Sequence, residues 1–215
     1  MKGVLVELMP AFGVSMPSII AFQFNPETLR HSWTQAMPAK GGSNPLAVQG
    51  MPGETFSFSL AMDATDQIAL GMTDPQGADA VLNGIYSRIS ALEMLMFPVK
   101  PDHMTGGVPA GVRRTVPASQ VPAVLFVWGE GRILPVRVTS LTITEKLFDE
   151  KLNPTHAEAQ IELRVLTPTE LKFFGALESV VTAAYNYTQG KREAGALFNT
   201  GTAAQSITLQ PIPGS

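Results

Sequence analysis

The chain has 215 residues, of which 15 are Lys or Arg and 18 are Asp or Glu, so its net charge is −3. A chain of this length can build a large hydrophobic core without disulfide or metal cross-links. The absence of cysteine excludes disulfide scaffolds, thiolate metal sites and cysteine nucleophiles. The slightly acidic balance argues against nucleic-acid binding. Only 15% of residues are charged, against about 25% in an ordinary globular domain. A surface so poor in charge favours burial against other subunits.

The N-terminal segment offers no good candidate for a membrane span or a signal peptide. Residues 8–26 carry no charge, but Pro10 and Pro17 would break a helix there and the segment would bring polar groups into lipid. Glu7 interrupts the apolar stretch that a signal peptide requires, so residues 3–8 are better interpreted as a strand. We therefore expect a cytoplasmic protein without a membrane insertion.

Apolar alternation predicts several strands in the first third of the chain. These strands are expected over residues 3–8, 18–24, 29–35 and 54–62. The last is the clearest, because Phe56, Phe58, Leu60 and Met62 share one face. Residues 36–53 are rich in Pro and Gly and predict a loop.

A single amphipathic helix is expected after the fourth strand. Asp74 is a suitable N-cap and Pro75 suits the first helical position. Apolar residues then recur at helical spacing as far as Met96, and Pro98 ends the pattern. Residues 98–122 show no periodicity and predict a long irregular loop, of a kind that is usually functional or disordered.

The second half predicts a central strand, a long hairpin and a helix. Residues 123–128 are apolar on both faces, and residues 132–148 alternate with a change of parity near Ser140 that predicts a β-bulge. Residues 157–165 are expected to be the second strand of this hairpin, which has one solvent-exposed face. The capping box Thr167-Pro168-Thr169-Glu170 then opens a helix that reaches Tyr185. We expect a domain over residues 1–187 and an extended tail over 188–215.

Candidate catalytic groups are few and scattered. His31, His103 and His156 lie far apart, and only His103 has an adjacent acid, Asp102. Acidic residues lie together in sequence at Asp63, Asp66, Asp74 and Asp79; a cation or glycosidase site is possible there, but a turn and a helix start explain them better. We predict no catalytic residue, no cofactor and no metal.

Four segments together resemble one known family. FQFNPETL over residues 22–29 and PGETFSFSL over 52–60 resemble motifs of contractile injection system tube-type proteins. PAVLFVWG over 122–129 is similar to that family's central strand. VTSLTITEKLFD over 138–149, followed by LNPTHA over 152–157, is similar to its long hairpin, although His156 replaces the usual Arg.

The resemblance implies an α+β, mainly β fold: a tail-tube-like antiparallel β-sandwich or barrel with a flanking helix and a C-terminal helix. It also implies a homo-oligomeric, hexameric ring, with a spike or hub protein, the inner tube protein and other baseplate subunits as partners. Within the family, the chain resembles the baseplate adaptor or tube initiator that links hub and tube around a payload conduit, without the LysM module that many adaptors carry. Its injection particle would be assembled in the cytoplasm and can be released.

Subunit contacts are expected at three places: the turn after the second strand, the long loop and the end of the hairpin. The two arginines of the loop can contact a partner or act as a solubilising pair. The candidate residues are Phe24, Asn25, Pro26, Arg113, Arg114, Leu147 and Phe148. Three alternatives stay open: an inner-tube repeat subunit, a β-sandwich module that binds carbohydrate or cell wall, and a barrel hydrolase that uses Asp102 and His103.

Overall fold

The computed structural model describes residues 1–8, 18–35, 46, 48, 50–97 and 122–208, and every structural statement below concerns these residues. The candidates Arg113 and Arg114, the Asp102–His103 pair and the predicted loop at 98–121 lie outside them.

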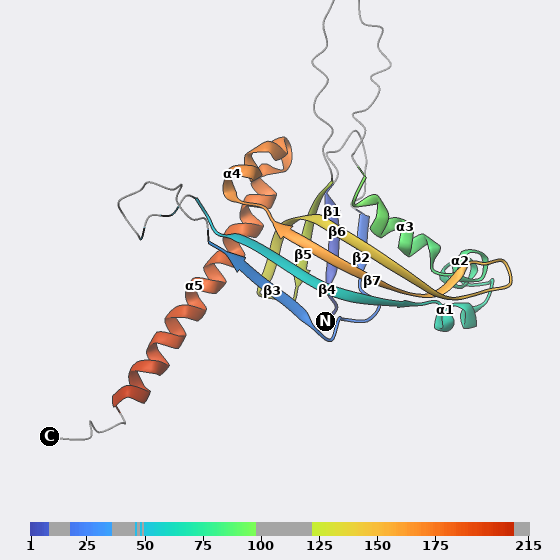
Figure 1. Ribbon diagram of the computed structural model, residues 1–215, viewed down its shortest axis with the longest axis horizontal. Coiled ribbons are helices and arrows are strands. Elements are labelled where there is room, and N and C mark those ends of the chain that lie inside the picture. The colour runs from blue at the N-terminus through green and yellow to red at the C-terminus, as the bar shows by residue number, and fades with distance from the viewer. Residues whose placement is uncertain (9–17, 36–45, 47, 49, 98–121, 209–215) are drawn as a thin grey trace, which may run out of the picture.

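One curved, seven-stranded antiparallel sheet forms the body of the molecule (Figure 1). Its spatial order is β2-β1-β5-β6-β7-β4-β3, so β2 and β3 are edge strands that each pair on one side only. The strands are β1 (Val4–Leu8), β2 (Ser18–Ala21), β3 (Leu29–Thr34), β4 (Gly53–Asp63), β5 (Ala123–Trp128), β6 (Arg132–Phe148) and β7 (Pro154–Val165). The expected α+β, mainly β class is confirmed, and the sheet is open rather than closed into a barrel.

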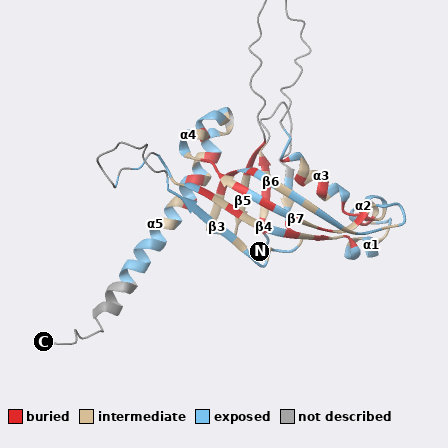
Figure 2. Cartoon of the chain, in the orientation of Figure 1, coloured by how far each residue is buried: buried red, intermediate tan, exposed pale blue. Residues whose placement is uncertain are grey.

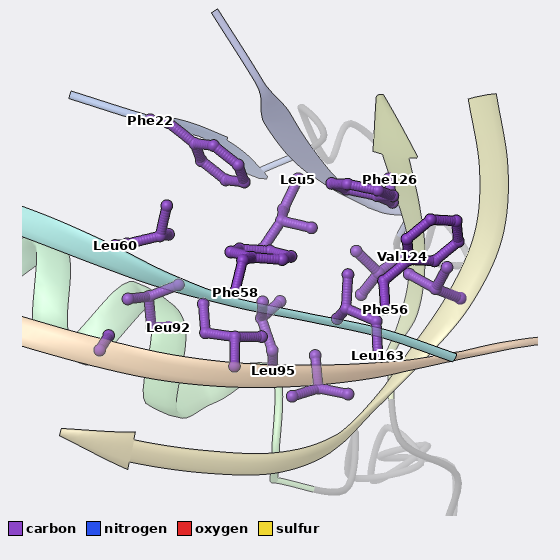
Figure 3. Packing of buried hydrophobic residues seen from close by; sticks show 14 of the residues in the cluster. Leu5, Phe22, Phe56, Phe58, Leu60, Leu92, Leu95, Val124, Phe126 and Leu163 are labelled. Carbon is purple, nitrogen blue, oxygen red and sulfur yellow. The ribbon is translucent and has the colours of Figure 1, made fainter. Parts of the chain in front are cut away.

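The inner face of the sheet carries a stack of aromatic side chains (Figure 3). The ring of Phe58 lies 5.4 Å from that of Phe22 and 5.6 Å from that of Phe126. Phe56 lies on the other side of Phe126, at 5.3 Å. Because these rings come from β4, β5 and the residue after β2, the stack joins the two ends of the curved sheet.

Strands β6 and β7 form the long hairpin that the alternation predicts. The register between them shifts between Val138 and Ser140, which confirms the bulge. Before the bulge β6 pairs with β5 as well as β7, and beyond it β6 pairs with β7 alone. On its other side β7 pairs with β4 as far as Asp63 opposite His156, so the sheet beyond the bulge has three strands. The hairpin passes the end of β4 only in its last residues, around the turn at 149–153.

The single helix expected over residues 74–97 is wrong, because the structure divides it at Gly84. Helix α1 (Thr65–Leu70), which the sequence did not predict, precedes α2 (Pro75–Asn83) and α3 (Tyr86–Met94). Gly84 has φ = +61°, and a Cβ there would lie 2.1 Å from the carbonyl oxygen of Pro154. This close approach lets Ile85 donate its N–H to the same oxygen at 2.9 Å.

The C-terminal region is helical over a longer range than expected. The capping box opens α4 (Pro168–Leu171), a 3₁₀ turn (Lys172–Leu177) follows, and α5 runs over Glu178–Thr208. The break lies at Gly175, which has φ = +55°. Residues 188–208, expected to be extended, thus continue a helix that packs on β6 and then runs away from the sheet (Figure 1).

The same view coloured by burial shows a buried sheet interior and an exposed far half of α5 (Figure 2). Val181 and Tyr185 are buried against the body, whereas each described side chain from Glu193 to Gly201 is exposed. No helix within the described ranges has both the length and the hydropathy to cross a membrane.

Candidate assembly surface

The outer face of the sheet is polar, in contrast to its aromatic inner face. Buried and less buried residues alternate along β4 and β7, so the polar set of each strand faces away from the core. Cross-strand pairs on this face are Ser57 with Glu162 and Ser59 with Gln160, and Thr142 of β6 also pairs with Gln160. Short hydroxyl side chains on β4 and β6 thus flank a row of longer polar side chains on β7.

This outer face is hollowed. A concavity of about 880 Å³ lies between the polar row of β7 and the turn that connects β2 to β3. Phe24 and Arg30 line it from the turn and β3, and Glu158 and Glu162 line it from β7. The lining mixes polar and apolar groups and bears both signs of charge, and its polar groups can form hydrogen bonds with water.

The Asn25-Pro26 turn, one of the candidate contact regions, has an internal structural role. The Asn25 side chain accepts the N–H of Gly3 at 2.9 Å and donates to the carbonyl of Met1 at 3.0 Å. Phe24, next to it, exposes 48% of its surface. The amide therefore holds the N-terminus in place, Pro26 is half-buried, and Phe24 is the large apolar side chain that this turn exposes.

The tip of the β6–β7 hairpin is held by a dense set of hydrogen bonds around one carboxylate. Asp149 Oδ1 accepts the N–H groups of Lys151 and Asn153, both at 2.8 Å, and its Oδ2 accepts Nδ2 of Asn153 at 2.8 Å. The same Nδ2 donates to the carbonyl of Leu82 at 3.1 Å, which ties the tip to α2. The bonds from Asn153 above all lower the pKa of Asp149 below its ordinary value.

This well-ordered tip presents apolar side chains to solvent. Leu147 and Leu152 expose 72% and 80% of their surface, and Phe148 is also exposed. Leu147 and Leu152 have φ of +47° and +65°, a left-handed conformation that costs a non-glycine residue roughly 1 kcal/mol. Strained backbone under exposed apolar side chains is characteristic of contact and switch sites. The candidates Leu147 and Phe148 therefore lie together here, and among the residues that the structure describes no hydrogen bond or ring contact joins them to the Phe24 turn.

A buried ionic cluster fastens α5 to the edge of the sheet, and the sequence analysis did not identify it. Glu54 is 3% exposed; its Oε1 accepts a hydrogen bond from Nε2 of His31 at 2.8 Å and another from the Arg192 guanidinium. The Arg192 guanidinium also lies over the ring of Trp33, 4.8 Å from its centroid. One signal was available: Glu54 has the parity of Phe56, so alternation places it toward the core, where a carboxylate needs a partner.

The acidic residues considered as a cation or glycosidase site have local roles instead. Asp63 accepts the N–H of Thr65 at 2.7 Å, and Asp74 accepts those of Gln76 and Gly77, as an N-cap does. Asp79 accepts Nδ2 of Asn83 and the hydroxyl of Ser87, so it links α2 to α3. In the part of the chain that the structure describes, no group of three or more His, Asp or Glu side chains could hold a metal ion.

The fold and this surface together define a class of protein: a β-sheet building block with free sheet edges, a polar outer face and an apolar projecting tip. A sequence model of the contractile injection system tube protein family matches residues 11–173. The chain belongs to this family of structural, tail-tube-like components, as the motifs of the sequence indicated. No curated protein matches the chain significantly.

Proposed function

We propose that this chain is a non-enzymatic ring component of a phage tail-like contractile injection system. It would link the spike hub and baseplate to the inner tube and line the payload conduit. Assembly in the cytoplasm and a ring of six copies are part of the same proposal. Family membership supports the general role.

The free edge strands carry this proposal. Phe22 donates its N–H to the carbonyl of Gly3, the residue before β1. In the alternating pattern of an antiparallel pair, the N–H of Ala21 therefore points to the free edge of β2. Strand β3 ends the sheet on the other side. Free edges invite pairing with another chain, and head-to-tail pairing that closes a ring removes them without forming an open fibre.

The polar outer face supports the conduit role. A bore that passes a payload is filled with water, and the hydroxyl, amide and carboxylate groups over β4, β7 and β6 keep their hydrogen bonds to water there. The aromatic face of the same sheet is already buried in the protomer. Assembly would therefore bury edges and leave the polar face open.

Electron microscopy of the purified chain tests this function, with one residue of the β2 edge as a probe. The wild-type chain is expected to form rings, and Ala21→Pro, which removes a free-edge N–H without touching the β1 pairing, is expected to fold and remain monomeric. Ala21→Ser is the matched control, because it keeps the N–H, adds little volume at this exposed position and should keep the rings. Rings from Ala21→Pro would contradict edge pairing, and a wild-type chain that stays monomeric would contradict the function.

A second candidate is the repeating subunit of the inner tube, which the family's description as a tube protein favours. The same images distinguish the two candidates. Single rings, or rings capped by other components, support the adaptor, whereas long stacks of this chain alone support the repeat.

A further inference from the structure

We propose that the apolar hairpin tip of one copy docks into a groove beside strand β2 of a second copy. This inference rests on the proposed ring function and names the part of a neighbouring copy that would cover the free edge of β2, since Ile19 and Ala21 of that strand line the groove. The tip consists of Leu147, Phe148 and Leu152 with the flanking Glu150 and Lys151. The groove lies between β2, α3 and the far end of β4.

The groove has the size and the chemistry to receive such a tip. It encloses about 700 Å³, and Phe22, Leu60 and Leu92 contribute apolar lining. Ile19 of β2 exposes 63% of its surface at this site, and Ala91 of α3 lines the opposite wall. No residue of the tip lines the groove of its own chain, so the tip can enter only the groove of another copy.

Hydrogen bonds of the Gln23 side chain fix the position of the groove's walls. The side chain of Gln23 takes the place of a strand partner for Asp63: it accepts the N–H of Asp63 and donates to its carbonyl, both at 2.9 Å. Arg88 of α3 donates to the same Gln23 oxygen. The residues after β2, the end of β4 and α3 are thereby held at a constant separation, so the groove is formed before a partner arrives.

The tip is equally pre-formed, which reduces the entropy that docking would cost. Asp149 and Asn153 hold the loop, and Gly84 and Pro154 join it to the helices. The left-handed backbone at Leu147 and Leu152 is a further indication. A surface turn with no partner would tolerate Asn or Gly at such positions, whereas large apolar side chains there favour a contact.

The charges around the tip and the groove are complementary. Glu150 and Lys151 are exposed beside the tip. The groove is lined by Lys2 and Arg88, which suit Glu150, and by Asp66, which suits Lys151. A second copy of this chain therefore offers both the apolar fit and the opposite charges. Because the tip and groove are different surfaces, the contact is head-to-tail and belongs to rings or stacks rather than to isolated dimers.

Engineered cysteines test the contact directly, because the natural chain has none. Leu152→Cys marks the tip and Ala91→Cys marks the groove. After mixing and mild oxidation under conditions in which wild-type rings are seen, we expect a disulfide-linked heterodimer as the main product. In the control mixture, Leu197→Cys replaces the tip variant, because Leu197 lies on the far half of α5 and is similarly exposed. This mixture should give at least tenfold less disulfide-linked heterodimer.

A second variant separates docking from folding. Asn tolerates left-handed backbone better than Leu, so Leu147→Asn/Leu152→Asn should raise the melting temperature of the protomer while it weakens assembly at least tenfold. Leu197→Asn should change neither. Rings that form normally from the double variant, or a tip–groove mixture that cross-links no better than the control, would overturn the docking while the ring function stands. A wild-type chain without rings would contradict both.

Discussion

The hairpin tip and the far half of α5 both extend beyond the core and both expose apolar side chains, but they differ in how they are supported. The tip is fixed by Asp149 and Asn153 and joined to α2. The helix beyond Arg192 carries Gly195 and Gly201 and presents only exposed side chains as far as Gly201. A pre-formed surface can bind at low entropic cost, whereas a helix exposed on all sides depends on its own propensity.

The largest expected effect is on the support of the tip. Gly84→Ala should destabilise the protein by about 3 kcal/mol, because a Cβ at φ = +61° would meet the Pro154 carbonyl oxygen. Urea unfolding followed by circular dichroism measures the change. Gly131→Ala is the matched control, since open space surrounds that position. Equal stability of the two variants would show that the tip does not depend on this contact.

The next effect concerns the buried cluster of Glu54, His31 and Arg192, which fastens α5 to the sheet at the point where the exposed half of the helix begins. Arg192→Met should cost about 2 kcal/mol, because Glu54 stays buried and loses one of its two partners. Lys191→Met alters a neighbouring, exposed cation and should change stability by less than about 0.5 kcal/mol. Thermal unfolding measures both. A loss of similar size in the two variants would contradict a specific role for the buried cluster.

A smaller effect is expected within the exposed far half of α5. Gly195→Ala should stabilise that segment by about 1 kcal/mol, because alanine is the better helix former, and should slow hydrogen exchange there. Global unfolding should not change, since this segment does not contact the core. If the substitution raised the global unfolding midpoint instead, the far half of α5 would be part of the folded body after all.

The smallest effect is an acid-dependent one at the start of α4. Hydrogen bonds from Arg164 above all lower the pKa of Glu170 to about 2. Since the folded pKa lies below the unfolded one, the carboxylate stabilises the fold above about pH 4.5 and loses this effect as the pH falls through about 2. The two side chains are 36% and 35% exposed, so solvent screens the pair and it contributes less than about 1 kcal/mol. Glu170→Gln should therefore show a smaller loss of urea midpoint between pH 6 and pH 2.5 than the wild type, and an unchanged loss would contradict the assignment.

Alternation was sufficient to predict the strands, because a sheet with one buried face imposes it. The limits of β5 followed from its continuous apolar run, and those of β6 and the bulge near Ser140 followed from alternation and its change of parity. The break at Gly84 could not be predicted, since a glycine inside an amphipathic pattern acquires meaning only when the Pro154 carbonyl lies against it. The groove beside β2 was also beyond sequence reasoning, because it depends on Gln23 meeting Asp63 across 40 residues.

The candidate contact residues also divide into those whose role the sequence predicted and those whose role it could not. Leu147 and Phe148 were identified through motif resemblance, and the structure exposes both at the tip. Asn25 belongs to the same motif, yet its amide is occupied by the N-terminus. A motif preserves residues for folding and for contact alike, so the sequence could not separate these roles.

Native mass spectrometry of the purified chain tests the central claim, that copies of this protein close around a common axis. The account predicts one discrete assembled species, with a mass near six times that of a single chain. A chain that remains monomeric at every concentration examined would contradict it.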